Sequence, residues 1–291
     1  MYFFFQIALS GIATGAIYGL IAVGYSVTFM TTKALNFALG MWVMLGGMLT
    51  YSLTVQYHLH PLLVLAIVTG GLFALGFIAE RVSVFPFLRA GSDVWVMSTL
   101  AVGFLMIDIA EIIWGRNPTP VPPFLGKEPI YFGAVSILPQ QLLIIAAACA
   151  TFFVLDFFYR RTLTGKAFRA VAHSGDVSSL MGINTRRVEA SSYALACALA
   201  GIAGFLVVPL TLAEPQLGTV LGLKAFAIAI IAGLAAPRGI LICGLLYGAF
   251  EGLVSGYLYT GIRDILGFSI MIVALFLRPE GLFGKRQEER A

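Results

Sequence analysis

Apolar runs long enough to cross a lipid bilayer follow one another along almost the whole sequence, and they restrict the possible folds more than any other feature. A helix needs about 20 apolar residues to cross the hydrocarbon core. Runs near that length occupy residues 7–30, 35–56, 61–79, 94–114, 139–159, 188–212, 222–236, 239–258 and 262–278. The sequence therefore predicts an all-α, polytopic transmembrane helical bundle of about 8–10 membrane segments, some short or broken, in a single domain over residues 1–291.

The composition excludes a soluble globular domain. Hydrophobic residues make up 59% of the chain and charged residues 11%, with a mean hydropathy of +0.95. The net charge of +4 does not indicate nucleic-acid binding, because the basic residues lie between apolar runs. The three cysteines lie inside apolar runs without paired or metal-binding spacing. The first run has no basic leader and is longer than a signal-peptide core, so we expect a retained first helix.

Lysine and arginine clusters predict which loops face the cytoplasm. The segment 160–187 has one acidic residue, Asp176, and its basic residues are Arg160, Arg161, Lys166, Arg169, Arg186 and Arg187. The tail carries Arg278, Lys285, Arg286 and Arg290. Both segments should be cytoplasmic, which agrees with the four crossings between them. The loop 115–138 then lies outside, and Trp95 and Trp114 bracket one crossing as interfacial anchors about 30 Å apart.

Glycines recur every four residues in two of the apolar runs. One series is Gly11, Gly15 and Gly19; the other is Gly244, Gly248, Gly252 and Gly256. Such a series gives a helix a smooth strip, which in lipid allows two backbones to approach closely. We expect these strips to pack helices together. The alternative is a substrate path lined by glycines.

Two apolar segments are interrupted by polar or helix-breaking residues. One is "TTKALNFALGMW"; the other is "GLKAFAIAIIAGLAAPRGILICGLL", broken by Pro237, Arg238 and Gly239. Paired broken segments in a transporter indicate a central site, because unwound backbone at membrane depth must line a cavity or be buried in protein. Ordinary tight turns are the alternative for both segments. For Lys224 in the second segment, a further alternative is that its side chain snorkels to a membrane interface. The candidate substrate-path residues are Asn36, Phe37, Gly40, Lys224 and Gly233.

Other charged residues in the apolar runs have two interpretations. Asp108 and Glu111 share a helix face, so they could form a proton or cation site, but they lie close to Trp114 and water. We favour an interfacial or structural role for both, and similarly for Glu80, Asp156 and Glu251. His58 and His60 are a weak metal signal and fit a polar external loop better.

Motifs for chemistry are absent from the sequence. There is no phosphate-binding G-x-x-x-x-G-K-[ST] loop, no G-x-S-x-G and no H-E-x-x-H. The chain therefore resembles a conduit rather than an enzyme. If transport is active, its energy comes from an ion gradient or from another subunit.

The segment 160–187 has the pattern of two short helices. "LTGKAFRAVA" is a basic amphipathic helix, Gly175 breaks it, and Asp176 can cap a second helix that Gly182 ends. Thr185 can cap the next crossing. A short helix at the membrane surface could dock on a cytoplasmic motor through Val177, Leu180 and Met181. The alternative is a plain connecting loop.

Five stretches together resemble one known family over essentially the whole chain. They are "YGLIAVGYSVTF", "LNFALG", "TGKAFRAVAHSGDVSSLMGINTRRV", "GLKAFAIAIIAGL" and "RPEGLFG". The sequence resembles the LivH-type permease subunits of branched-chain amino acid importers of the ATP-binding-cassette (ABC) class. The resemblance implies that residues Ala172 to Gly182 form a coupling helix seated on an ATPase, with the contact residues His173, Ser174, Gly175, Asp176, Leu180, Met181 and Gly182.

The same resemblance implies a multi-pass protein of the bacterial inner membrane that works within a complex. Its partners would be a second homologous permease subunit (LivM-type), two cytoplasmic ATPase subunits and an extracytoplasmic solute-binding protein. ATP and Mg would bind in the ATPases, and this chain would hold no cofactor or metal and catalyse no reaction. The protein would also contact the lipid bilayer, and it would not bind nucleic acid.

The sequence departs from that family beside Asn36. Members often have His or Gln where this chain has Leu39, and Glu where it has Met41. A path lined by this segment would be more apolar than usual. The resemblance implies a branched-chain or other hydrophobic amino acid as the substrate; because related systems also carry aromatic acids, urea and amides, these are the alternatives. A stand-alone secondary transporter or channel using Asp108 and Glu111, and a membrane enzyme or scaffold, are the remaining alternatives.

Overall fold

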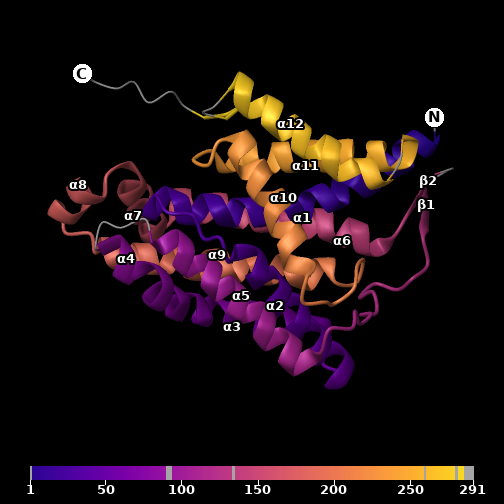
Figure 1. Ribbon diagram of the computed structural model, residues 1–291, viewed down its shortest axis with the longest axis horizontal. Helices are drawn as coiled ribbons and strands as arrows, with labels where there is room; N and C mark the ends of the chain where they lie inside the picture. Colours follow the sequence, from indigo (N-terminus) through magenta and orange to yellow (C-terminus); the bar gives the residue numbers. More distant parts are fainter. Residues whose placement is uncertain (1, 90–93, 133–134, 259, 279–280, 285–291) are drawn as a thin grey trace.

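The computed structural model describes residues 2–89, 94–132, 135–258, 260–278 and 281–284 of the chain, and most of these residues are helical (Figure 1). The helices are α1 (Tyr2–Thr32), α2 (Leu39–Tyr51), α3 (Pro61–Ala79), α4 (Phe85–Arg89), α5 (Trp95–Trp114), α6 (Pro139–Arg161), α7 (Leu163–His173), α8 (Gly175–Leu180), α9 (Thr185–Val207), α10 (Leu217–Ala232), α11 (Pro237–Tyr257) and α12 (Arg263–Leu277). Single turns of π-helix follow α2 (Ser52–Gln56) and α3 (Glu80–Val84), and a 3₁₀ turn (Thr260–Ile262) precedes α12.

A small hairpin is the one strand pair in the part of the chain that the structure describes. Strands β1 (Ile130–Phe132) and β2 (Val135–Ile137) pair antiparallel, with Ile130 opposite Ile137. Six of the described helices are long and apolar enough to cross a membrane, and α10 is a shorter apolar helix. The predicted all-α, polytopic membrane fold is confirmed.

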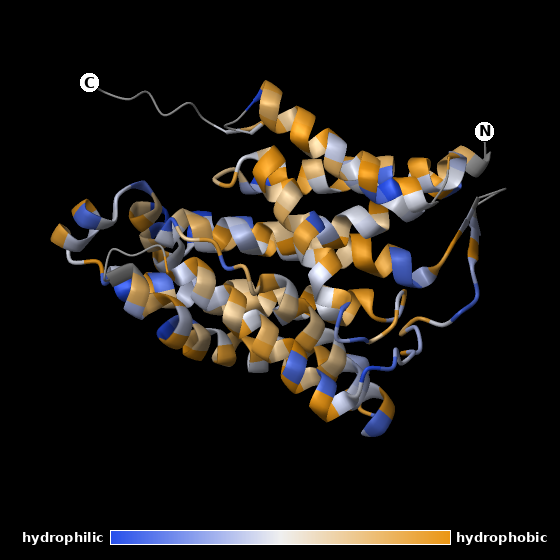
Figure 2. Ribbon diagram, in the orientation of Figure 1, coloured by the Kyte–Doolittle hydropathy of each residue, from blue (hydrophilic) through white to orange (hydrophobic). Residues whose placement is uncertain are grey.

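The bundle has two distinct ends. Helices α7 and α8 lie at one end, and the N-terminus and the β1–β2 hairpin lie at the other (Figure 1). Gln6 donates a hydrogen bond to Ser136 of the hairpin at 3.0 Å, and Lys33, just after α1, donates to the carbonyl of Ala172 in α7 at 3.2 Å. Helix α1 therefore begins at the hairpin end, which the sequence left open. Hydrophilic residues gather toward the two ends, and the helices between them consist largely of hydrophobic residues (Figure 2).

The last described residues return to the α7 end of the bundle. Arg238, at the start of α11, pairs with Asp156 near the end of α6 at 3.2 Å. Phe283 packs against Gly239 in the same turn of α11. The segment 160–187 and residues 281–284 thus share one end, as the four predicted crossings require. The basic residues Lys285, Arg286 and Arg290 of the predicted cytoplasmic tail lie outside the described residues.

The two glycine strips pack against each other. A β-carbon built on Gly15 or Gly11 of α1 would collide with the backbone of Gly244 or Gly248 of α11. A larger side chain at any of these contact positions would separate the two helices, since close approach in lipid depends on small residues. The packing interpretation of the strips is confirmed. Helix α9 occupies the centre of the bundle, while α3, α5 and α6 are largely exposed.

Candidate functional site

The first interrupted segment is a buried turn between α1 and α2. Asn36 is 2% exposed, and its side-chain oxygen accepts the backbone N–H of Ala38 at 3.1 Å. Leu39, the first residue of α2, packs against Gly24 of α1. Gly24 lies about 12 Å along α1 before the last residue of that helix, Thr32. Helix α2 therefore begins inside the bundle rather than at its surface. Asn36 organises this turn, as the tight-turn alternative expected.

The start of α2 meets the first half of α10 at backbone distance. A β-carbon on Gly40 would collide with the carbonyl of Gly218 and approach the α-carbon of Gly222 to 2.9 Å. Tyr25 of α1 donates its hydroxyl to the carbonyl of Gly222 at 3.4 Å. The structure thus brings together one end of the first interrupted segment and the helix that leads into the second.

Four aromatic side chains surround this contact, and we call Tyr25, Phe37, Trp95 and Phe226 the aromatic cluster. The ring centroid of Phe37 lies 5.5 Å from that of Phe226 and 6.4 Å from that of Trp95, and Tyr25 lies 5.5 Å from Phe226. Tyr25 is buried, and the other three are half-buried. Sequence reasoning selected Phe37 alone. It assigned Trp95 to interfacial anchoring and gave no role to Tyr25 or Phe226, because their proximity depends on the meeting of α1, α2 and α10.

The second interruption lies at residues 233–236, before the predicted break at Pro237 to Gly239. Gly233 ends α10 with φ +93°, and Pro237 occupies the first turn of α11, where its missing N–H costs nothing. Residues 282 and 283 pack on this turn. The backbone N–H groups of Leu282 and Phe283 donate to the carbonyls of Ile231 and Ala232 at 2.7 and 3.0 Å. Gly233 lies about 10 Å of helix beyond the aromatic cluster and does not join it.

Lys224 is part of a buried ion-pair network, which corrects the expectation that it snorkels. We call Lys224, Glu251, Arg263 and Asp264 the charge cluster. The ammonium of Lys224 lies 2.5 Å from Glu251 and 2.8 Å from Asp264, and Nε of Arg263 lies 3.0 Å from Glu251. The side chains of Lys224 and Glu251 are 2% and 5% exposed. Lys224 stays inside because it pairs there with two carboxylates, and Glu251 has a structural role in the same network.

The remaining charged residues have local partners near helix ends. Glu111 pairs with Arg116 at 2.7 Å, and Asp108 is exposed. Asp156 pairs with Arg160 at 3.0 Å as well as with Arg238. These contacts agree with interfacial or structural roles.

Two further predicted sites lie at helix ends. Glu80 is buried at the end of α3, where it lines a pocket with Arg81, Arg186 and Arg187. His60 caps α3 by accepting the N–H of Leu62 at 3.4 Å, and the described residues contain no group of His, Cys, Asp and Glu arranged to hold a metal ion.

Helices α7 and α8 form the predicted helical pair, with different capping residues. Ser174, not Asp176, caps α8 by accepting the N–H of Val177 at 3.4 Å, and Gly175 is the first residue of α8 rather than the break. The next crossing is capped by Asn184, not by the predicted Thr185. Each prediction was displaced by one or two residues because Ser, Asp, Asn and Thr are all competent caps. Gly182 ends the pair with φ +84°, as predicted.

The α7–α8 pair presents an apolar tip on a firm base. Leu180 and Met181 are 86% and 79% exposed, and Val177 is exposed beside them. At the base, Phe168 and Val171 of α7 are buried against Val188 of α9. His173 ends α7 next to this base, and Asp176 lies in the first turn of α8.

A helical bundle with a glycine-packed core, a helix that starts within the bundle and a helical pair projecting from one end defines a polytopic membrane protein of the transport class. The family model described as branched-chain amino acid transport system / permease component matches residues 7–275. The chain therefore belongs to this permease family.

Relatives match along almost their whole lengths. The chain is 28% identical to the high-affinity branched-chain amino acid transport system permease protein LivH of Salmonella typhimurium, over 99% of this chain and 98% of LivH. It is 27% identical to the corresponding BraD of Pseudomonas aeruginosa, over 100% and 99%. The solved structure of PsaBC from Streptococcus pneumoniae in complex with Fab covers 96% of this chain and 93% of that chain with a TM-score of 0.51 at 12% identity, which is a likeness of fold alone.

Proposed function

We propose that this chain is a membrane-spanning permease subunit of an ABC importer in the bacterial inner membrane, carrying branched-chain or other hydrophobic amino acids. A solute-binding protein delivers the solute at the hairpin end. Two ATPase subunits act at the α7–α8 end, and a second, LivM-type permease subunit completes the path. ATP and Mg bind to the ATPases, and this chain catalyses no reaction.

The observation that carries this proposal is the exposed apolar tip of α8. Leu180 and Met181 project from a basic, polar segment, where apolar side chains gain nothing from water and indicate a protein contact. The base of α7 packs on α9 and holds Lys33 at the end of α1. A displacement of α8 by a partner is thereby transmitted to the two central helices. These contacts support a coupling role for the segment from His173 to Gly182.

The aromatic cluster supports a path for apolar solutes. Phe37, Trp95 and Phe226 are half-buried and lie where α2, α5 and α10 meet. Leu39 is fully buried against Gly24, and Met41 packs against Gly103 of α5, so the two departures from the family pattern lie within apolar contacts. Hydrophobic amino acids fit such a surface better than urea or small amides do.

The test is ATP-dependent uptake of L-leucine into vesicles that contain the permease pair, the ATPases and the binding protein. The double variant Leu180→Asp/Met181→Asp should abolish uptake while ATP hydrolysis by the ATPases continues, because two carboxylates oppose docking on an apolar groove. Leu163→Asp is the matched control, since Leu163 is 84% exposed at the start of α7, outside the segment from His173 to Gly182. Unchanged uptake in the double variant, or uptake that follows an ion gradient without ATPases, would contradict the proposal.

A further inference from the structure

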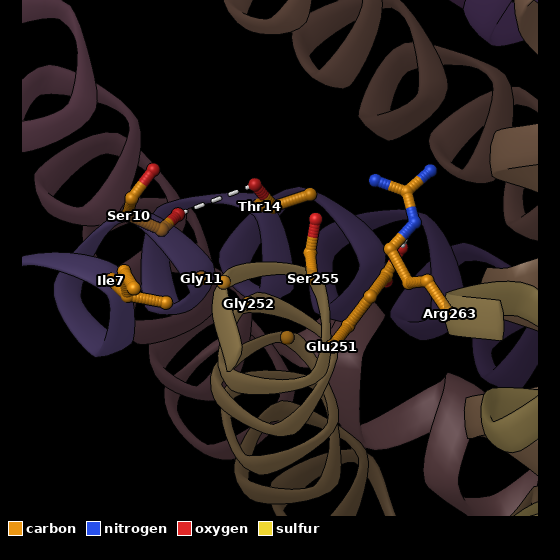
Figure 3. Close-up of a pocket in the computed structure, with 10 residues that line it drawn as sticks. Ile7, Ser10, Gly11, Thr14, Glu251, Gly252, Ser255 and Arg263 are labelled. Atoms are coloured by element: carbon orange, nitrogen blue, oxygen red, sulfur yellow. Dashed lines mark hydrogen bonds and ion pairs between the residues drawn. The ribbon is translucent and has the colours of Figure 1, made fainter. Parts of the chain in front are cut away.

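A groove lined by polar and apolar groups lies on the bundle beside the charge cluster, and we call it the outer groove. It has a volume of about 270 Å³ and is formed by α1, α11 and the start of α12 (Figure 3). Its floor is the glycine contact between α1 and α11, so backbone rather than side chains limits its depth. Residues of different chemistry surround this floor: Ile7, Ser10, Thr14, Glu251, Ser255 and Arg263.

Arg263 presents an open guanidinium edge in the outer groove. Its Nε lies 3.0 Å from a Glu251 oxygen and 3.4 Å from an Asp264 oxygen, as ion pairs without hydrogen-bond geometry. The two terminal nitrogens point away from Glu251 in Figure 3 and have no ion-pair or hydrogen-bond partner within the described ranges. A guanidinium that is ion-paired on one side and open on the other can bind a carboxylate through two parallel hydrogen bonds.

Acceptors for a cation lie next to that donor edge. Glu251 lines the groove with its side chain 5% exposed, and its Oε2 accepts no hydrogen bond from the described part of the chain. Such a buried and unsatisfied carboxylate oxygen is costly unless a ligand supplies a donor. The hydroxyls of Ser10, Thr14 and Ser255 lie on the same side of the groove as the guanidinium (Figure 3).

The charge balance of the cluster selects the net charge of the ligand. Lys224 and Arg263 offset Glu251 and Asp264, so the cluster is neutral before anything binds. A simple anion or cation would leave an uncompensated charge at a partly buried site, which is costly in a low-dielectric environment. A zwitterion adds no net charge and can lie antiparallel to the Arg263–Glu251 pair.

We propose that the outer groove binds an α-amino acid as its zwitterion, an inference that rests on the proposed function and adds an entry site to it. The carboxylate lies on the free edge of Arg263, and the ammonium lies toward Glu251 and the hydroxyl of Ser255. The side chain extends over the glycine floor toward Ile7. A volume of about 270 Å³ accommodates one amino acid.

The outer groove is joined to the loop where a binding protein would deliver solute. Gln141, just after the hairpin, donates to the hydroxyl of Ser10 at 2.9 Å, and Gln6 donates to Ser136 of β2 at 3.0 Å. The site thus lies at the hairpin end of the bundle, at the opposite end from α7 and α8. It receives the solute before the aromatic cluster does.

The experiment measures binding of radiolabelled L-leucine to the purified complex in detergent, without ATP. Isocaproate, which lacks the ammonium, and isoamylamine, which lacks the carboxylate, should each bind at least about tenfold more weakly than leucine, the factor of one charge-assisted hydrogen bond. Arg263→Lys keeps the charge and removes the fork. This variant should weaken the binding of leucine about tenfold and leave the binding of isoamylamine unchanged, because isoamylamine has no carboxylate for the guanidinium to bind.

Arg238→Lys is the matched control, since Arg238 is exposed and pairs with Asp156 at the far end of the bundle. Equal weakening of leucine and isoamylamine in Arg263→Lys would show a structural role only and overturn the inference. Equal affinity for isocaproate and leucine, or no leucine binding, would also overturn it. ATP-driven uptake would still occur in either case, so the proposed function would stand.

Discussion

Lys224→Met is expected to destabilise the bundle by about 3 kcal/mol, because it removes one partner of a buried ion pair. The lysine is 2% exposed and bridges Glu251 at 2.5 Å and Asp264 at 2.8 Å. Removing one partner from a buried pair costs about 3–5 kcal/mol, since the other charge is left uncompensated. Arg263 still neutralises part of the negative charge of Glu251, so we expect a loss of stability at the lower limit of this range.

The double variant Lys224→Met/Glu251→Gln separates this reasoning from a simple loss of packing. With both charges removed, the Arg263–Asp264 pair remains balanced, and the double variant should recover at least about half of the lost stability. The free energy of unfolding is measured by denaturant titration in detergent micelles. Lys166→Met, at an exposed position of α7, is the control and should change stability by less than about 0.5 kcal/mol. An unaffected Lys224→Met variant would refute the network. A double variant whose loss of stability equals the sum of the losses of the two single variants would refute it as well.

Two further changes test the packing and the turn. Gly248→Ala should destabilise the bundle by about 1–3 kcal/mol, since its β-carbon collides with the backbone of Gly15, whereas Gly70→Ala has nothing within 4 Å and should be neutral in the same unfolding assay. Asn36→Leu removes the hydrogen bond to Ala38 and should lower leucine uptake without reducing the amount of ATPase that copurifies with the permease. Normal uptake would limit Asn36 to shaping the turn without an effect on transport.

The features that sequence predicted well are periodic or local. The glycine strips depend only on a four-residue spacing, and their role in close helix packing followed from the chemistry of helix contacts in lipid. Their pairing with each other across α1 and α11 came from the structure. Gly182 was correctly placed at the end of the α7–α8 pair because a positive φ favours glycine. The caps were misplaced because several adjacent residues could serve, and local propensity does not rank them.

The charge cluster and the aromatic cluster could not be predicted in the same way. Each single charge in an apolar run looks interfacial, since its cost is judged without a partner. Lys224 and Glu251 are 27 residues apart, on different helices, and only the packing of α10 on α11 brings them together. Likewise, Tyr25 and Phe226 meet because α1 packs on α10, and hydropathy along the chain does not show which helices pack together.

The contact between α1 and α11 also has a consequence for how the protein is made. Gly15 and Gly244 are separated by about 230 residues, which ribosomes synthesise at about 5–20 residues per second, so on the order of 10–50 s pass between the emergence of the two helices. During that interval the first helix waits in the membrane with its closest neighbour unmade. Assembly is therefore completed late, and the insertion machinery or neighbouring lipid must shield that surface until the partner helix arrives.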